Sequence, residues 1–391
     1  MTEGLRRAWR RWRVERRLRS GGPLQGPEWV HVGIAEGCNY RCSWCRSHSR
    51  LLSSGGDQGE LPRRLYDELL EDLRLLGTRL VEFAGLGEPL LRRDAVSMIR
   101  AAKEAGLRAL LITNGSLLTP ELCEELVDLG VDTVNVSLNA ARDETHARIH
   151  DAPRGDWARI VEMVRYLRRA RDRRGDGRPF LSISMVVERE NYREILALAE
   201  QAVAVGVDHV FFAPLGVNPA SAQLVLTREE DEEARGLVRA ADAVLRAAGR
   251  RTNAAAFLDR PVDVYWTRDL FSHLPCHIGQ LYSRIHGTGE VFPCAAARAR
   301  GLGNLATMRF RDIWHSEAYR QFRREAVRLP RGGDRVEGCS CWTCGQHFLI
   351  KQYEERVRRG QVELQTKGLG CAAGRRSLAN LVARSPWRAA G

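Results

Sequence analysis

Six short apolar runs alternate with segments of helical periodicity, and this alternation limits the fold more than any other feature of the sequence. The runs cover residues 30–34, 80–84, 108–112, 133–138, 180–187 and 209–213. Helical patterns lie between them at 63–76, 94–105, 120–129, 156–171 and 191–205, and four of these end directly before a glycine. Strands that alternate with helices pair in parallel through right-handed crossovers. We therefore predict an α/β fold with a parallel sheet, flat or closed toward a barrel, that binds ligands where its strands end.

A cysteine-rich loop follows the first predicted strand directly. Cys38, Cys42 and Cys45 have the spacing CxxxCxxC, and Trp44 precedes the last of them. Three thiolates at this spacing can bind three irons of a cubane cluster and leave the fourth iron open to another ligand. The alternative is a zinc site or a set of buried thiols, but zinc needs a fourth nearby ligand, and only His48 is close enough in sequence.

Polar loops also follow the second, third and fourth predicted strands. The residues singled out are Gly85, Gly87, Glu88 and Pro89, then Thr113 and Asn114, then Ser137 and Asn139. Each loop alone is common in proteins of many kinds. Because the strands are expected to be parallel, the loops should meet at one edge of the sheet, together with the cysteine loop.

These motifs, in this order, resemble those of the radical S-adenosylmethionine (SAM) superfamily. The resemblance implies a partial (β/α)6 TIM-like barrel as the core and a [4Fe–4S] cluster on Cys38, Cys42 and Cys45. It also implies that the polar loop residues above hold SAM, with Glu88 at its amino group. Leu86 departs from the commonest form of the glycine-rich segment. By the same analogy, Ser182, Ser184, Asn191 and residues 212–215 are further candidates, although strand alternation alone also explains the two serines.

The activity that this resemblance implies is reductive cleavage of SAM to methionine and a 5′-deoxyadenosyl radical, which takes a hydrogen atom from the substrate. Such a reaction needs an electron donor, for which we expect a flavodoxin or ferredoxin. The sequence does not predict a catalytic acid or base.

A second group of cysteines lies beyond residue 250, where the alternation of strands and helices stops. Its members are Cys276, Cys294, Cys339, Cys341 and Cys344, and residues 287–293 have the pattern of a hairpin turn and short strand. The region resembles the SPASM and twitch domains, which implies one auxiliary [4Fe–4S] cluster. The implied ligands are Cys276, Cys294, Cys341 and Cys344, with Cys339 as a substitute. A zinc ribbon with four cysteine ligands is the alternative. Cys371 is interpreted as a free thiol or a further ligand, and Cys123 as a core residue.

We accordingly divide the chain into a basic helical arm (1–28), a radical SAM core (29–250), an auxiliary cluster domain (251–353) and a tail (354–391). The arm is arginine-rich, and Trp9 and Trp12 share one helix face. We expect this face to dock on the protein itself; contact with a membrane surface or a partner is the alternative. No run is long enough to span a membrane and no signal peptide is evident, so a cytoplasmic location is expected.

Three classes of function are compatible with these features. We favour oxidation or rearrangement of a small molecule, such as a sugar, a cyclitol or a natural-product intermediate, with the auxiliary cluster as electron acceptor. The first alternative is a maturase that modifies a ribosomally made peptide. The second is an RNA-modifying enzyme, which the net charge of +12 would permit, but nearly all of that charge is arginine and suits coding bias equally well. A metal-binding scaffold without catalysis would not explain why polar loops recur after four successive strands.

Overall fold

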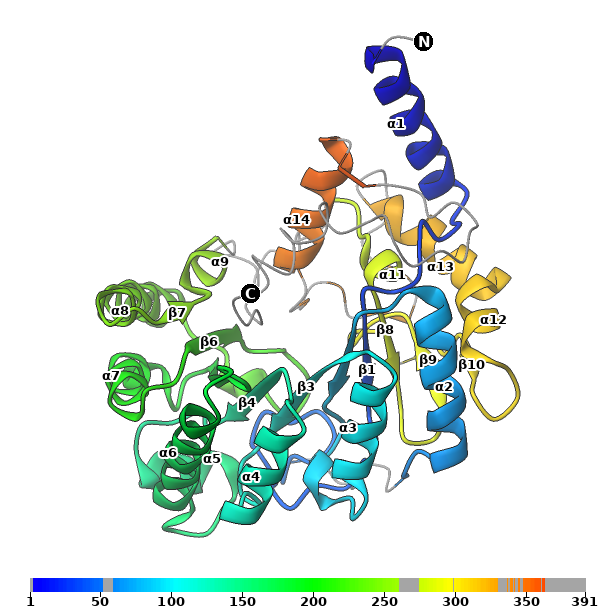
Figure 1. Ribbon diagram of the computed structural model, residues 1–391. Coiled ribbons are helices and arrows are strands. Elements are labelled where there is room, and N and C mark those ends of the chain that lie inside the picture. Colours follow the sequence, from blue (N-terminus) through cyan, green and yellow to red (C-terminus); the bar gives the residue numbers. More distant parts are fainter. Residues whose placement is uncertain are drawn as a thin grey trace.

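The computed structural model describes residues 3–51, 59–259, 274–297, 299–329, 336, 338–339, 341, 344, 347–359 and 361–362. Its centre is a parallel sheet in which the six predicted strands are neighbours in chain order. They are β1 (Trp29–Val32), β2 (Leu80–Phe83), β3 (Arg108–Thr113), β4 (Thr133–Ser137), β5 (Phe180–Val187) and β6 (His209–Pro214). The predicted parallel α/β fold is confirmed (Figure 1).

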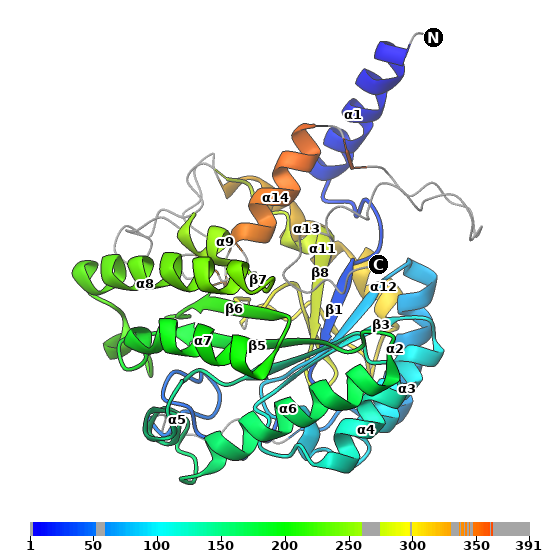
Figure 2. The same ribbon diagram turned by 60° about the vertical axis from the view of Figure 1, so that its left-hand side comes forward.

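Helices connect these strands along the outside of the curved sheet (Figures 1 and 2). They are α2 (Arg63–Leu76), α3 (Ala95–Glu104), α4 (Pro120–Asp128), α5 (Asp143–His150), α6 (Asp156–Arg174), α7 (Ile195–Val205) and α8 (Arg228–Ala247), with the short 3-10 turns η1 (Pro89–Leu91), η2 (Tyr192–Glu194) and η3 (Ala222–Leu224). Helices α2, α6 and α7 stop where a glycine adopts a left-handed conformation, at Gly77, Gly175 and Gly206. Helix α5 was not predicted, because its eight residues carry little apolar periodicity.

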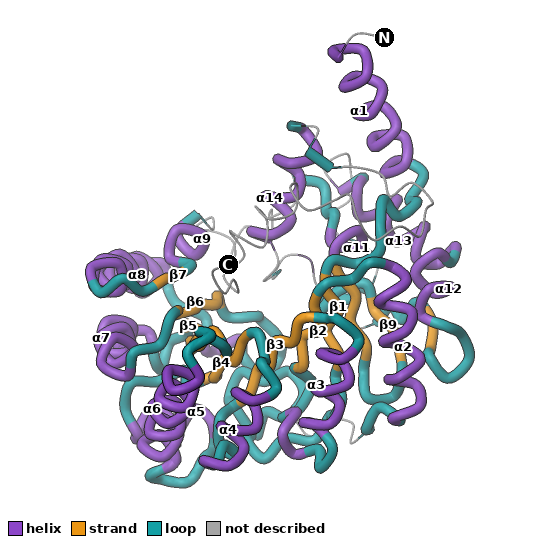
Figure 3. Tube along the Cα trace, in the orientation of Figure 1, coloured by secondary structure: helices purple, strands orange, loops and turns teal. Residues whose placement is uncertain are grey.

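The C-terminal region extends the same sheet beyond β1. Strand β8 (Tyr282–Ile285) pairs in parallel with β1, and β9 (Glu290–Phe292) and β10 (Gly303–Asn304) continue the edge in antiparallel pairing. The predicted hairpin is therefore present, between β8 and β9. At the other edge lie β7 (Arg251–Thr252) and then α9 (Ala254–Leu258). The remaining helices are α11 (Ile278–Leu281), α12 (Phe310–His315), α13 (Glu317–Val327) and α14 (His347–Arg358) (Figure 3).

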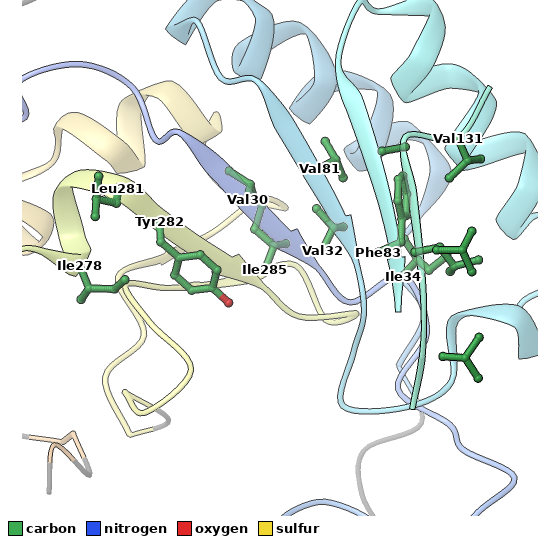
Figure 4. Close-up of a cluster of buried hydrophobic side chains, with 14 of the residues drawn as sticks. Val30, Val32, Ile34, Val81, Phe83, Val131, Ile278, Leu281, Tyr282 and Ile285 are labelled. Atoms are coloured by element: carbon green, nitrogen blue, oxygen red, sulfur yellow. The ribbon is translucent and has the colours of Figure 1, made fainter. Parts of the chain in front are cut away.

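The two faces of the sheet differ in chemistry, because successive side chains of a strand point to opposite sides. The outer face is apolar: Val30 and Val32 of β1 pack with Val81 and Phe83 of β2 and with Ile285 of β8 in the main core (Figure 4). The alternate positions form the inner face and carry polar side chains. Among them are His31, Glu82, Asn135, Ser182, Ser184 and Arg284. A polar inner face is what a barrel needs when its interior binds a ligand.

Helix α1 (Glu3–Arg19) projects from the body of the protein (Figure 1). Its attachment uses Val14 and Leu18, which are buried, and it packs on α13. Trp9 and Trp12 are 51% and 53% exposed. The expectation that these two rings dock on the protein is therefore wrong; the apolar side chains that dock lie further along the helix. Each ring instead lies under an arginine of the same helix, Arg13 and Arg16 respectively. None of the described helices is both long and apolar enough to span a membrane.

Replacing Trp9 and Trp12 together with serine is expected to change the free energy of unfolding by no more than about 0.5 kcal/mol, because the rings are half-exposed. The matched control is Leu18→Ala, which empties a buried position and is expected to cost about 2 to 4 kcal/mol. Denaturant unfolding monitored by circular dichroism measures both. A tryptophan double variant as unstable as Leu18→Ala would contradict the exposed placement.

Candidate functional site

The loop that follows β1 is braced along its backbone by α5 and by the loop after β6. The amides of Arg41 and Ser43 donate to the carbonyls of His150 and Ile149, at 3.0 and 2.8 Å. On the other side, the Asn218 amide donates to the carbonyl of Trp44 at 3.0 Å. These contacts fix the backbone between Cys38 and Cys45 from two directions, so the three thiols are held in a loop of defined shape.

Several hydrogen bonds reach the sulfurs of this loop. The backbone amides of Tyr40 and His48 donate to Cys38 Sγ and Cys45 Sγ, at 3.5 and 3.2 Å. His150 Nδ1 lies 3.0 Å from Cys42 Sγ, and Asn139 Nδ2 lies 3.3 Å from the other ring nitrogen. The imidazole of His150 is thus held between the Cys42 sulfur on one side and the Asn139 amide and the Leu138 carbonyl on the other. Hydrogen bonds to ligating sulfurs are one means by which a protein sets the potential of an iron–sulfur cluster.

The chemistry of the three thiols fits a metal cluster. Burial raises the pKa of Cys38 to about 11, and burial together with its neighbouring thiolates raises the pKa of Cys42 well above its usual value. Neutral thiols do not ligate metals, but cationic iron favours the thiolates and displaces their protons. No three cysteine, histidine or carboxylate side chains among the described residues converge closely enough for a single metal ion. A cubane cluster bonds each thiolate to a different iron, and so suits thiols that are spread around one loop.

The glycines after β2 allow two backbones to meet. A Cβ on Gly87 would lie 2.0 Å from the carbonyl oxygen of Gly37, and one on Gly85 would lie 3.0 Å from that of Ala35. The next amide, of Glu88, donates to the Gly37 carbonyl at 2.8 Å. In this structure the glycines thus bring the loop after β2 against the start of the cysteine loop, where any larger residue would force the two apart.

The buried carboxylate of Glu88 joins the ends of β2 and β3. It accepts hydrogen bonds from the hydroxyl of Thr113 and the amide of Asn114, both at 2.7 Å, and from the amide of Leu90 at 3.1 Å. Burial raises the pKa of Glu88, while these donors act in the opposite direction. Pro89 begins η1 directly after it. Three of the residues predicted to contact SAM are thus linked to one another.

Asn114 carries this network to the cysteine loop. Its side-chain nitrogen donates to Asn39 Oδ1 at 2.9 Å, and Asn39 in turn donates to the Ser116 hydroxyl at 2.7 Å. Asn39 and Ser116 were not singled out from the sequence, since short polar residues in loops give no distinguishing signal. His150 was missed for a related reason, because it ends the unpredicted α5.

Asn139 adopts a left-handed conformation with φ 59° and is buried at the end of β4. Its Oδ1 accepts from the amide of Val186 at 2.8 Å, and its own amide donates to the Ser184 carbonyl at 3.0 Å. The Asn191 side chain donates to the Asn139 carbonyl at 3.0 Å. Both asparagines were predicted to line the SAM site. In the structure, their side chains form hydrogen bonds with backbone groups and so stabilise the conformation of the loops after β4 and β5.

The predicted serines lie in register on the inner face. Ser137 of β4 pairs with Ser184 of β5, whose hydroxyl accepts from the Asn135 amide at 3.0 Å. Ser182 lies 2.9 Å from His209 Nδ1. Residues 212–215 contain the end of β6, where Phe212 is buried in the outer core. Of the three serines, Ser137 and Ser184 lie nearer than Ser182 to the edge at which the loops meet.

The C-terminal thiols lie within electrostatic reach of one another, although no three of them among the described residues lie closely enough to share one metal ion. Burial, and then the charges of Cys344, Cys294 and Cys341, raise the pKa of Cys276. These are the three other ligands that the sequence analysis assigned with it. Hydrogen bonds that the Cys339 thiol donates to Cys294 and Cys341 raise the pKa of Cys339, so the substitute ligand lies in the same group. Cys371 lies outside the described residues, and Cys123 is buried in α4 as predicted.

The two thiol groups lie at opposite ends of the same strands. Cys38 follows the carboxyl end of β1, whereas Cys276 precedes α11, which leads into the amino end of the parallel neighbour β8. Cys294 follows β9, which runs back antiparallel to β8 and ends at that same amino end. A four-residue strand spans about 13 Å. The inner face of β8, β1 and β2 therefore lies between the two groups of sulfurs.

Two family models match the chain. The radical SAM superfamily model matches residues 32–212, and the SPASM iron–sulfur cluster-binding domain model matches residues 276–345. The AdoMet-dependent heme synthase of Methanosarcina barkeri is 29% identical over 315 residues, covering 76% of this chain and 85% of the relative. The PqqA peptide cyclase of Ruegeria pomeroyi is 29% identical over 320 residues, covering 78% and 80%.

Among solved structures, Streptococcus suis SuiB bound to its precursor peptide SuiA has the same fold. It is 16% identical with a TM-score of 0.62, and the match covers 86% of this chain and 75% of SuiB. At this level of identity the likeness concerns the fold alone.

Gly87→Ala is expected to abolish iron binding at the Cys38 loop, because the added Cβ collides with the backbone of Gly37. Anaerobic reconstitution followed by iron counting should show about four irons in place of about eight. Gly236→Ala is the matched control, since a Cβ there meets open space in α8. Equal iron content in the Gly87 variant and the wild type would contradict the close approach.

Glu188, at the end of β5, is expected to make stability fall between about pH 4.5 and 7. Burial raises its pKa from 4.5 to about 7, so in this window the folded chain keeps a proton that the unfolded chain has released. The free energy of unfolding should fall with rising pH by up to about 1.4 kcal/mol per unit from this group. Denaturant unfolding across this window should show a flatter dependence in Glu188→Gln. A variant with the same slope as the wild type would show that Glu188 ionises normally.

Proposed function

Because the chain belongs to the radical SAM superfamily and carries a C-terminal SPASM domain, we propose that it oxidises a small, non-peptide molecule on the inner face of its sheet. The chain is a radical SAM enzyme, with a SAM-binding [4Fe–4S] cluster and an auxiliary iron–sulfur cluster. When bound, these groups supply the hydrogen-abstracting radical and an acceptor for the electron left on the substrate. A substrate that gives up a hydrogen atom, and then an electron and a proton, is oxidised by two electrons.

The residues of this chain would divide that work as follows. Cys38, Cys42 and Cys45 would hold the SAM-binding cluster, and the loops tied together by Glu88 would orient SAM beside it. Cys276, Cys294, Cys341 and Cys344 would hold the auxiliary cluster, with Cys339 as the alternative ligand. A flavodoxin or ferredoxin would supply the first electron.

The observation that carries this proposal is the position of the inner face between the two groups of thiols. A substrate placed there lies next to the hydrogen-abstracting end and faces the electron acceptor at the other end. Relatives named AdoMet-dependent heme synthase, from Methanosarcina barkeri and two other organisms, match over about three quarters of this chain. Their name denotes the synthesis of a non-peptide product.

Modification of a peptide is the second candidate. It is favoured by the PqqA peptide cyclases of Ruegeria pomeroyi and Rhodopseudomonas palustris, which match over 78% and 75% of this chain. In that case the same arrangement would act on a peptide side chain that enters the inner face.

The test separates the assignment of the clusters from that of the substrate. We expect about eight irons in the wild type and about four in a Cys38/Cys42/Cys45→Ala variant. Of these two proteins, only the wild type should form 5′-deoxyadenosine from SAM and dithionite. A Cys276/Cys294→Ala variant should also hold about four irons, still cleave SAM and fail to oxidise substrate.

Substrate class is tested with a cell extract, before and after exhaustive proteolysis. Substrate-dependent formation of 5′-deoxyadenosine that survives proteolysis supports the small molecule. Stimulation that proteolysis abolishes supports the peptide and overturns the first proposal. Oxidation that continues in the Cys276/Cys294→Ala variant would remove the auxiliary cluster from the reaction.

A further inference from the structure

Three ionisable side chains, Arg284, His31 and Glu82, are aligned in register across the inner face of β8, β1 and β2. His31 of β1 is paired in register with Glu82 on one side and with Arg284 on the other. His31 Nδ1 lies 2.9 Å from Glu82 Oε1, so the carboxylate of this row has a partner in the imidazole. The row lies between the two groups of thiols, where the proposed function places the substrate.

Arg284 has no counter-ion among the described residues. It is 6% exposed, none of the described carboxylates lies within ion-pair distance of it, and its Nε has no hydrogen-bond partner. A guanidinium is charged at any physiological pH, and burying it unpaired costs several kcal/mol unless something supplies the opposite charge. Such a cost is expected where a ligand completes the site.

A second guanidinium increases the positive charge. Arg46 directly follows Cys45, and its Nη2 donates to the Val217 carbonyl at 2.9 Å. Arg46 lies within electrostatic reach of Arg284. Like charges in a partly buried region repel, and a bound anion reduces that repulsion.

We propose that Arg284 and Arg46 bind an anionic oxygen group of the substrate, either a carboxylate or a phosphate. The guanidinium fork matches both groups, because each presents two oxygens in a plane. This inference rests on the proposed function for the identity of the occupant, but the anion site itself does not depend on turnover. Held there, the anionic group would fix which carbon of the substrate faces the cysteine loop.

The test measures the binding of simple anions to the reconstituted, dithionite-reduced enzyme with saturating S-adenosylhomocysteine, which lacks the sulfonium that the reduced cluster cleaves. The probes are ¹³C-formate and inorganic phosphate, observed by ¹³C and ³¹P NMR. Because the reduced cluster on the Cys38 loop is paramagnetic, an anion bound beside Arg46 should show a broadened line. In Arg284→Gln the affinity should fall about tenfold or more, the value of one charge-assisted hydrogen bond. Arg284→Lys, which keeps the charge but not the fork, should recover part of it.

The matched control is Arg246→Gln, which removes an exposed arginine of α8 that pairs with Asp242. It should leave the line widths unchanged, and iron counting should show that every variant keeps both clusters. Broader lines for formate identify a carboxylate substrate, and broader lines for phosphate a phosphorylated one. Absence of broadening in the wild type, or equal broadening in Arg284→Gln, overturns the proposal. Loss of the auxiliary cluster would refute the proposed oxidation without changing this result.

Discussion

The buried carboxylate of Glu88 is the contact on which the geometry of the edge depends where the loops after β1, β2 and β3 meet. It holds the ends of β2 and β3 through three donors, and Asn114 extends this network to Asn39 in the cysteine loop. A carboxylate in this position is stabilised only while its donors stay in place, and each donor would be left unsatisfied without it. The loops that follow three consecutive strands therefore form one unit.

The regular part of the fold could be predicted because its signals are local. Helix α2 matches the prediction at both ends, since leucines at helical spacing lead to Gly77 in a left-handed conformation. Strand β8 could not be identified as a neighbour of β1, because β1 lies about 250 residues earlier in the chain. The sequence of a four-residue strand also contains no signal that specifies its partner. The exposure of Trp9 and Trp12 could not be predicted either, since an arginine-rich helix with two tryptophans has the same pattern whether or not the rings dock.

In the candidate site, too, the sequence predicts local features better than long-range contacts of side chains. The sequence identifies which loops meet, and the structure brings Gly87, Glu88, Thr113 and Asn114 together as expected. The sequence does not reveal whether a polar side chain faces a ligand or the backbone. The side chain of Asn139, for example, accepts a hydrogen bond from the backbone amide of Val186. The charged row of His31, Glu82 and Arg284 is visible only once strand register is known.

The pairing of β1 with β8 also determines when the sheet around β1 can form during synthesis of the chain. Until Tyr282–Ile285 has left the ribosome, β1 has a neighbour on one side only, and the edge facing β8 stays open. The loop of Cys38 to Cys45 begins at that open edge. Although Cys38, Cys42 and Cys45 are among the first residues made, the loop after β1 reaches its final surroundings only when the last quarter of the protein has emerged. A chain released before that point would leave this loop next to an unpaired strand edge, which favours aggregation.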